Sequence, residues 1–351
     1  MESRKIKTAL ASFGMSGKVF HGPLLHVHDG FEISKILERN RSESNKRYPS
    51  SQIVRKYADI ITDKNIELVI INTPDHIHYE MTKHALEAGK HVVVEKPFTL
   101  KYAEADELIK IAKKKKRLLS VFQNRRWDSD FLTVQKVIKN KLLGRLVEYE
   151  AHFDRYRTFI QDNWKEDASI GTGTLYNLGS HLIDQALVLF GFPQWVFADV
   201  RHARKDSKVD DAFDIRLGYP EVRVTLKASY LVREPGPKYI LHGEQGSFHK
   251  YGMDIQEEEL KKGRWPKGEN WGKEPEQMYG SLVSNLNGTE FQGKVASDPG
   301  NYSAFYDSIY QAVVHDEKPL VPATQARDVI RIIEAAYESA ANRSVIKLDG
   351  K

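Results

Sequence analysis

A regular alternation of short apolar runs and amphipathic segments across the first third of the chain constrains the fold more than any other feature. Runs rich in β-branched residues that alternate with helical patterns and short loops are typical of a doubly wound parallel sheet. The predicted strands cover residues 6–13, 31–37, 68–71, 91–95 and 118–122, and the predicted helices cover residues 77–88 and 102–115. We therefore predict an α/β domain over residues 1–125.

The predicted strand at 91–95 ends in charged residues. Three valines at 92–94 read as a buried strand, and Glu95, Lys96 and Pro97 follow them. Because Pro97 has no N–H to donate, a central strand cannot continue through it. The charged pair is therefore predicted at the carboxyl end of the strand, the edge of a parallel sheet where ligands bind. The alternative is a strand end with two solvated charges.

A glycine-containing loop follows the first predicted strand. Its sequence matches the dinucleotide-binding pattern GxGxxG, except that Ser12 replaces the first glycine. In this pattern the backbone approaches a pyrophosphate closely at the N-terminus of a helix, and serine is small enough for the tight turn. The predicted cofactor-binding loop consists of Ser12, Phe13, Gly14, Met15, Ser16 and Gly17.

The second predicted strand ends in Glu38 and Arg39. An acidic residue about 20 positions after the glycines binds the ribose hydroxyls in such domains. An arginine at this place instead holds the 2′-phosphate of NADP with its planar guanidinium. The pair leaves both NAD and NADP open, and the arginine favours NADP.

The pattern changes in the remaining two thirds. Segments 213–219 and 222–230 alternate apolar and polar residues, which indicates an antiparallel sheet with one buried face. We predict an α+β domain over residues 126–351 with a large, mostly antiparallel open sheet, whose polar face meets solvent or another subunit. Residues 254–301 read as a polar excursion with partial packing, and the final helix at 324–343 is a candidate to pack back towards the N-terminal domain.

An apolar helical segment behind a glycine-rich turn carries three polar side chains. Asn177, His181 and Asp184 are spaced i, i+4 and i+7, which places them on one face of a helix. A lone histidine in such a helix is usually a core residue with satisfied hydrogen bonds. Three polar groups on one face indicate a site instead.

Composition excludes several classes of protein. Hydrophobic residues make up 40% of the 351 residues and charged residues 29%, which fits a globular chain and not a disordered one. The absence of cysteine excludes disulfides, thiolate metal sites and a cysteine nucleophile, and we expect a cytoplasmic protein without a metal site. We also expect no signal peptide and no membrane span. Although the net charge is +5, the chain lacks the basic, aromatic-interleaved face that nucleic acid binding requires.

Together these motifs closely resemble the Gfo/Idh/MocA family of nicotinamide-dependent sugar and polyol oxidoreductases. The resemblance covers nearly the whole chain. It rests on the glycine loop with residues 20–23 (FHGP), on 73–78 (TPDHIH), on 95–97 (EKP) and on 179–184 (GSHLID). Within the family, residues 239–259 resemble the branch that contains NADP-dependent scyllo-inositol dehydrogenases.

The resemblance implies a Rossmann fold for the first domain and roles for particular residues. Lys96 and His181 match the family's catalytic lysine and histidine, and Glu95 and Pro97 would shape the turn that aims Lys96. Further cofactor contacts are implied for Thr73, Pro74, His78, Glu95, Lys96 and Trp164, and substrate contacts for Asn124, Arg126, Asp154, Asn177, His181 and Asp184. The family also implies NADP or NAD as cofactor, a small-molecule polyol or sugar as substrate, and homodimers or homotetramers.

The chain departs from the family pattern at Asn177, where active members commonly carry aspartate. An amide can orient a hydroxyl but cannot take its proton, so acid–base chemistry is expected to fall on Lys96 and His181. Because a paired carboxylate would oppose the neutral form of a lysine base, Glu95 is predicted to point away from Lys96.

The predicted reaction is hydride transfer between the nicotinamide and a secondary alcohol or ketone of a cyclic polyol, sugar or sugar acid, with an inositol-type substrate favoured. Two alternatives are a cofactor-binding regulator without turnover and an NAD-dependent glycoside hydrolase of the same family.

Overall fold

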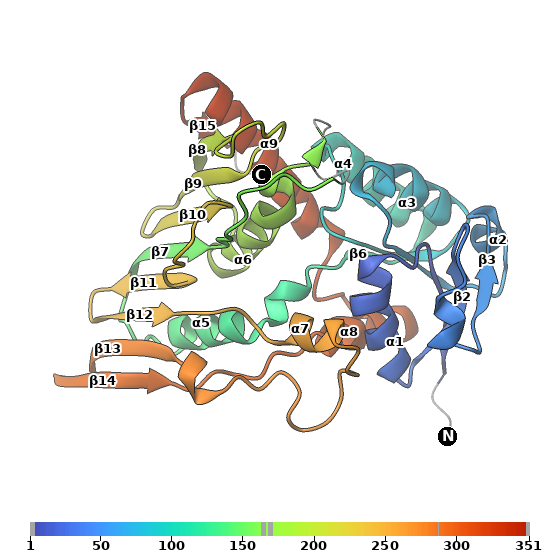
Figure 1. The fold of residues 1–351 in the computed structure, drawn as a ribbon, viewed down its shortest axis with the longest axis horizontal. Coiled ribbons are helices and arrows are strands. Elements are labelled where there is room, and N and C mark those ends of the chain that lie inside the picture. Colours follow the sequence, from blue (N-terminus) through green and yellow to red (C-terminus); the bar gives the residue numbers. More distant parts are fainter. Residues whose placement is uncertain (1–3, 163–165, 168–170, 287, 349–351) are drawn as a thin grey trace. The chain divides into compact units, whose positions relative to one another are not determined.

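The computed structural model describes residues 4–162, 166–167, 171–286 and 288–348, which form two compact units (Figure 1). The first unit contains the chain up to Asn124 together with residues 256–271 and 301–327, and the second contains residues 125–255, 272–300 and those from Asp328 onward. The chain therefore contributes three segments to the first unit, whereas the sequence predicts a single boundary near residue 125.

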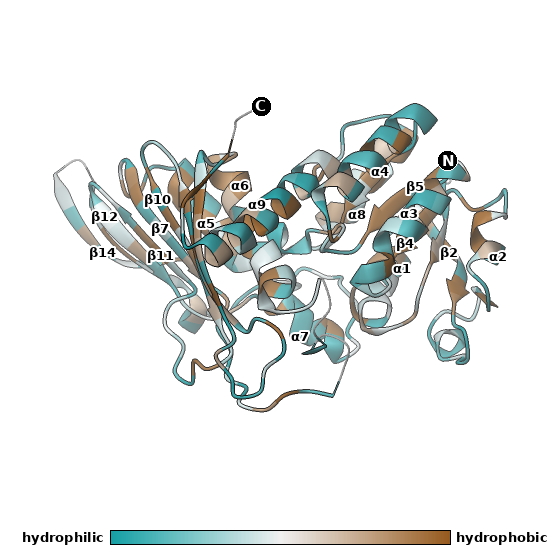
Figure 2. Ribbon diagram, turned by 90° about the horizontal axis from the view of Figure 1, so that it is seen from above, coloured by the Kyte–Doolittle hydropathy of each residue, from teal (hydrophilic) through white to brown (hydrophobic). Residues whose placement is uncertain are grey.

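A six-stranded parallel sheet forms the centre of the first unit. Its strands are β1 (Ile6–Leu10), β2 (Phe31–Leu37), β3 (Gln52–Val54), β4 (Leu68–Ile71), β5 (His91–Val94) and β6 (Leu119–Val121), in the spatial order β3-β2-β1-β4-β5-β6. This is the order of the doubly wound dinucleotide-binding fold, in which the chain reverses its direction of strand addition between β1 and β4. Every residue of β4 is buried, and the strand is coloured as hydrophobic in Figure 2. The predicted parallel α/β domain is confirmed.

The helices of the first unit come from both early and late parts of the chain. Apart from the short 3-10 turns η2 (Ser44–Lys46) and η3 (Asp75–Ile77), they are the π-helical turn η1 (Gly17–His21), α1 (Gly22–Val27), α2 (Ala58–Ile61), α3 (His78–Glu87), α4 (Tyr102–Lys115), α7 (Gln256–Lys261) and α8 (Ser303–Val314). The segment after α7 is fixed by Trp265, whose ring centroid lies 4.0 Å from the guanidinium carbon of Arg47 and 4.6 Å from the ring centroid of His26. This packing explains why residues 256–271 belong to the first unit.

A nine-stranded sheet forms the centre of the second unit. Its strands are β7 (Leu146–His152), β8 (Trp195–Arg201), β9 (Ala212–Gly218), β10 (Arg223–Ser229), β11 (Tyr239–Gly243), β12 (Gly246–Lys250), β13 (Gly280–Leu286), β14 (Thr289–Val295) and β15 (Ile346–Lys347). They lie in the order β14-β13-β12-β11-β7-β10-β9-β8-β15, and only the β7–β10 pair is parallel among the described pairs. The predicted mostly antiparallel sheet is confirmed.

One face of this sheet is covered by helices α5 (Ser129–Lys139) and α6 (Ser180–Phe190), and the π-helical turn η6 (Leu175–Gly179) precedes α6 (Figure 1). The alternating residues Val224, Leu226 and Ala228 of β10 are buried beneath η6 and α6. Helix α9 (Ala323–Asn342) begins in the first unit and continues in the second.

Candidate active site

The loop after β1 is held by Asn72, the residue that follows β4. The backbone N–H of Ser12 donates to Asn72 Oδ1 (3.0 Å), and Asn72 Nδ2 donates back to the carbonyl oxygen of Ser12 (2.9 Å). The Ser12 hydroxyl donates to the Asn72 carbonyl (3.0 Å) and accepts from the N–H of Gly14 (3.2 Å). The serine that replaces the first glycine thus stabilises the turn with its side chain. Asn72 is not among the predicted site residues. Its position directly after a buried strand is the sequence feature that could have identified it.

Gly17 lies against this pair of residues. A Cβ atom at position 17 would stand 2.7 Å from Ser12 O and 2.8 Å from Asn72 Nδ2, closer than non-bonded atoms approach. At Gly14 the nearest atom to a Cβ would be Ser12 Oγ at 3.5 Å, an ordinary contact. Of the two glycines in this loop, only Gly17 is therefore required by packing in the protein itself.

We expect Gly17→Ala to lower the free energy of unfolding by about 1–3 kcal/mol, since the added methyl group must push the loop away from the sheet edge. Gly14→Ala is the matched control and should change stability by much less. Urea denaturation of both variants without cofactor measures the difference. Equal midpoints for the two variants would contradict this packing argument.

Glu38 and Arg39, directly after β2, differ in whether their charged groups are bonded within the protein. The Glu38 carboxylate is buried and accepts hydrogen bonds from the backbone N–H groups of Glu43 and Ser44, each 2.9 Å long. Arg39 is exposed, and its guanidinium has no hydrogen bond or ion pair with any residue that the structure describes. The acid is engaged within its own loop, and the arginine is the side chain available to a ligand.

His78 connects the loops that follow β4 and β5. Its Nδ1 lies 2.9 Å from the carbonyl oxygen of Pro97, and its Nε2 lies 3.0 Å from that of Thr73. The ring is fully buried, and Pro74 directly follows its partner Thr73 in the sequence. The structure thus brings the predicted cofactor-groove residues Thr73, Pro74 and His78 to the edge where Lys96 and Pro97 lie.

Glu95 is bonded to a histidine and to the backbone of the next residue. Its Oε1 lies 3.0 Å from His21 Nε2, and its Oε2 accepts the backbone N–H of Lys96 at 3.0 Å. On the other side of the ring, His21 Nδ1 lies 2.6 Å from the hydroxyl oxygen of Tyr306. Lys96 is half-buried, and the Lys96–Pro97 peptide bond is cis. The direction of the Glu95 carboxylate relative to the Lys96 amine stays a prediction.

The surroundings of Glu95 favour its charged form. Burial alone would raise the pKa of its carboxyl, but the hydrogen bond from His21, together with the positive charge of Lys96, holds this pKa below its usual value. Burial raises the pKa of Tyr306 well above its usual value, so its hydroxyl keeps its proton. The site therefore contains a buried carboxylate directly before Lys96.

In the second unit, His181 lies on α6 and stacks on Phe153, with ring centroids 6.3 Å apart and planes 26° apart. One turn further along α6, Asp184 forms a bidentate ion pair with Arg126, in which Nε–Oδ2 is 2.8 Å and Nη2–Oδ1 is 2.6 Å. Both members of the pair are buried. Two predicted substrate contacts, Arg126 and Asp184, thus bind each other one turn from His181, while Asn177 lies in the preceding π-helical turn.

Asp210 anchors the start of that π-helical turn. Its carboxylate accepts the backbone N–H of Leu175 (2.7 Å) and the hydroxyl of Tyr337 (2.7 Å), and burial raises its pKa. Gly173 has a φ of +90°, and a Cβ there would stand 2.2 Å from Asp210 Oδ1. The glycine-rich turn is therefore needed to bring Asp210 onto the N-terminus of the helical segment that carries Asn177 and His181.

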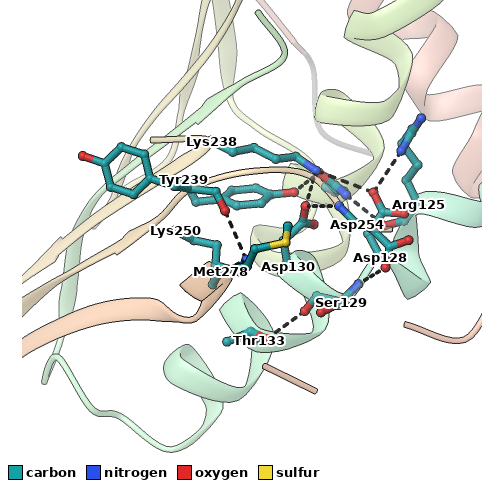
Figure 3. A network of polar contacts seen from close by, with 12 residues as sticks. Arg125, Asp128, Ser129, Asp130, Thr133, Lys238, Tyr239, Lys250, Asp254 and Met278 are labelled. Atoms are coloured by element: carbon teal, nitrogen blue, oxygen red, sulfur yellow. Dashed lines mark hydrogen bonds and ion pairs between the residues drawn. The ribbon is translucent and has the colours of Figure 1, made fainter. Parts of the chain in front are cut away.

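A buried network of charged groups lies at the N-terminus of α5 (Figure 3). Lys238 Nζ bonds to Asp130 Oδ2 (2.7 Å), and Asp254 accepts the backbone N–H of Ser129 at 2.7 Å and donates its own N–H to Asp130 (3.2 Å). Burying these charges requires such pairing. None of these residues is predicted from the sequence, although an acidic run directly before an apolar helix is a recognisable helix start.

The same network reaches the ring beneath His181. Arg125 Nη1 bonds to Asp128 (3.2 Å), as Figure 3 shows. The Arg125 guanidinium carbon and Lys238 Nζ lie 5.1 and 5.8 Å from the centroid of the Phe153 ring. Since His181 stacks on the Phe153 ring, the network contacts the same ring against which the histidine packs.

Asp154 lies just beyond β7, where the chain continues to pair with β10 through the N–H groups of Phe153 and Arg155, each 2.9 Å from its acceptor. Side chains alternate along such extended backbone, so Asp154 points to the opposite face from Phe153, on which His181 stacks. Its Oδ2 lies 2.9 Å from His152 Nδ1, in a groove of about 450 Å³ on the open face that Asp199 and Lys227 also line. The structure does not bring Asp154 together with His181.

The remaining predicted residues are placed as follows. Asn124 is buried. It begins a short helical turn and is the last residue of the first of the three segments that form the first unit. Trp164 lies outside the described residues. Among the residues that the structure describes, no group of three or more His, Asp or Glu side chains could hold a metal ion, and no helix is long and apolar enough to cross a membrane.

Comparisons with known proteins agree with this architecture. Residues 6–123 match the NAD-binding Rossmann-fold model of the Gfo/Idh/MocA oxidoreductase family, and residues 135–348 match the model of its C-terminal alpha/beta domain. Among solved structures, an oxidoreductase from Bacteroides fragilis is 50% identical with a TM-score of 0.92, covering 98% of this chain and 100% of that one. The oxidoreductase yvaA from Bacillus subtilis is 40% identical with a TM-score of 0.96, covering 99% and 100%.

Among curated proteins, the scyllo-inositol 2-dehydrogenase (NADP(+)) IolW of Bacillus subtilis is 40% identical over 98% of this chain and 96% of its own length. The uncharacterized oxidoreductase YdgJ of Escherichia coli is 39% identical over 99% of each chain. Both family models and these full-length relatives lead to one conclusion: this chain is an oxidoreductase of the Gfo/Idh/MocA family, with an NAD-binding Rossmann domain followed by the family's C-terminal alpha/beta domain.

Proposed function

We propose that the protein is an NADP-dependent dehydrogenase that oxidises a secondary alcohol of a cyclic polyol, with inositols as the favoured substrate class. The observation that carries the proposal is the 40% identity, over 98% of the chain, to an NADP-dependent scyllo-inositol 2-dehydrogenase. We take Lys96 and His181 as the family's catalytic lysine and histidine; Lys96 lies at the carboxyl edge of the parallel sheet and His181 lies on α6. The polar open face of the second sheet remains the predicted surface for assembly into a dimer or tetramer.

The features of the first unit fit NADP, the dinucleotide that carries a 2′-phosphate. The lack of room for a Cβ at Gly17 reflects a tight turn of the kind that brings backbone close to a pyrophosphate. Arg39 offers a permanent charge for a 2′-phosphate, while Glu38, which would bind a free 2′-hydroxyl, is already bonded within its own loop. We propose that the cofactor is held by Ser12, Phe13, Gly14, Met15, Ser16, Gly17, Arg39, Thr73, Pro74 and His78, with Trp164 as a further contact.

The bound nicotinamide would accept the hydride, and a group of the protein must accept the proton of the alcohol. Lysine has a pKa of about 10.4 when free, so holding Lys96 neutral at pH 7 would cost roughly 4–5 kcal/mol. The ionised Glu95 next to it favours the charged form instead. In place of the base expected from the sequence, we therefore assign Lys96 as the cation that donates a hydrogen bond to the substrate oxygen. His181 is the group that takes the proton, and Asn177 orients the hydroxyl.

A cofactor-resolved activity screen tests the proposal. Purified protein is mixed with NADP or NAD and with scyllo-inositol, myo-inositol, aldoses and sugar acids, and the reduced nicotinamide is followed by absorbance. We expect turnover of an inositol with NADP. Tight NADP binding with no turnover on any substrate would overturn the proposal in favour of a cofactor-binding regulator, a reading that Asn177 in place of the usual acid supports.

A further inference from the structure

A chain of three buried polar side chains leads from α8 to the backbone of Lys96. The hydroxyl oxygen of Tyr306 lies 2.6 Å from His21 Nδ1, His21 Nε2 lies 3.0 Å from Glu95 Oε1, and Glu95 Oε2 accepts the N–H of Lys96 at 3.0 Å. Tyr306 and His21 are completely buried, and Glu95 is 8% exposed. The proposed reaction gives no direct task to His21 or Tyr306, because neither is exposed to a substrate.

The partners of His21 determine which of its nitrogens carries the proton. Glu95 is held ionised, so it can only accept a hydrogen bond, and the proton of a neutral imidazole must be on Nε2. Nδ1 is then an acceptor, and the Tyr306 hydroxyl, which keeps its proton, donates to it. Tyr306 therefore fixes the tautomer of His21, and His21 in turn presents an N–H to Glu95.

The local fold places His21 for this contact. His21 is the last residue of the π-helical turn η1, and such turns commonly occur at functional sites. Its ring also packs on Phe122, with centroids 4.4 Å apart, which limits its rotation. The imidazole is therefore held on both edges and on one face.

The titratable groups that interact electrostatically with Glu95 are His21, Lys96, His78 and Tyr306. Burial raises the pKa of the Glu95 carboxyl, and among these groups the hydrogen bond from His21 lowers it most. Loss of this bond would leave a buried carboxylate without its main donor, and such a group takes up a proton. The negative charge next to Lys96 would then be lost.

On the basis of the proposed function, we propose that His21 and Tyr306 are positioning residues for Lys96. Through Glu95 they fix the backbone at Lys96 and keep a negative charge beside its amine, which holds the amine in the charged form that donates to the substrate oxygen. They touch neither substrate nor cofactor.

Three variants test this proposal by steady-state kinetics across pH. In His21→Phe we expect kcat to fall about 10- to 100-fold, with KM for NADP changed less than about twofold. The basic limb of the kcat profile should move to lower pH by about half a unit or more, because Lys96 loses its proton more readily once Glu95 is neutral. His21→Gln, whose amide can donate to Glu95, should restore most of the activity and the position of the limb.

Tyr306→Phe removes only a hydroxyl group and keeps the proposal testable if His21→Phe does not fold. It should move the basic limb in the same direction by a smaller amount. A lowered kcat with an unmoved pH profile, equal in the Phe and Gln variants of His21, would overturn the proposal and assign these residues to packing alone.

The tautomer gives a readout that does not depend on turnover. Long-range ¹H–¹⁵N spectra of the wild-type protein at pH 8, with His21 assigned by its loss in His21→Gln, should show a proton on Nε2 and none on Nδ1. A proton on Nδ1 would overturn the inference even if the enzyme is active. If no substrate is turned over but Nε2 carries the proton, the proposed function fails and the hydrogen-bonded chain stands.

Discussion

Lys96→Met should lower kcat for polyol oxidation by about 10³-fold or more while NADP binding changes little. Methionine keeps most of the length and the apolar stem of lysine but removes the charge and all three N–H donors, so the substrate oxygen loses its cationic partner. A positioned group that acts on a proton or on developing charge contributes about 10²- to 10⁴-fold to a rate. The cofactor should still bind, because the loop after β1 and Arg39 are unchanged.

The control for this variant is Lys114→Met, which removes an equal charge from the exposed end of α4 in the same unit. kcat and KM are measured for both variants, and the dissociation constant of NADPH is measured by its fluorescence. A fall in kcat of less than tenfold for Lys96→Met would remove Lys96 from the chemistry. A large loss of NADPH affinity would instead make it a binding residue.

Arg39→Ala should raise KM for NADP by about 10- to 100-fold and leave KM for NAD within about threefold. A hydrogen bond between charged groups is worth about 1.5–3 kcal/mol, which corresponds to this range, and NAD has no phosphate at this place. The prediction depends on Arg39 being exposed with no described partner, while Glu38 is bonded to the N–H groups of Glu43 and Ser44.

Arg41→Ala is the matched control, since Arg41 is an exposed arginine two residues away that pairs with Glu43 (3.1 Å). It should affect the two cofactors alike and only slightly. An equal rise in KM for NADP and NAD in Arg39→Ala would show that Arg39 does not read the 2′-phosphate. The same result in both arginine variants would indicate a general effect of surface charge.

Local sequence patterns were sufficient for the type of each sheet, parallel or mostly antiparallel, but not for all strands of the second sheet or for how distant segments join the two units. The alternation of apolar runs and helices predicted five of the six parallel strands. β3 was missed because only Val54 of its three residues is buried, so it leaves no apolar run in the sequence. The contribution of residues 256–271 to the first unit depends on Trp265, which packs on Arg47 more than 200 positions earlier. Hydrophobic periodicity and turn motifs are local features of a sequence, so they cannot reveal such a contact.

At the candidate site, the sequence predicted which residues stand at the sheet edge but not how they are bonded. Glu38 matched a ribose ligand in its spacing, whereas its actual partners are two amides of the following loop. His21 appeared only as part of a motif, because its partner Tyr306 is 285 residues away. Asp154 was grouped with His181, whereas the two-residue period of a strand turns it to the other face.

The most direct test of the central claim follows the hydride itself. Scyllo-inositol carrying deuterium on its ring carbons is incubated with the protein and NADP, and the reduced cofactor is analysed by mass spectrometry. We predict NADPH that is heavier by one deuterium, formed in proportion to the ketone product. Unlabelled NADPH, or cleavage of a glycoside with no net change in the cofactor, would contradict hydride transfer from a polyol to NADP as the function of this protein.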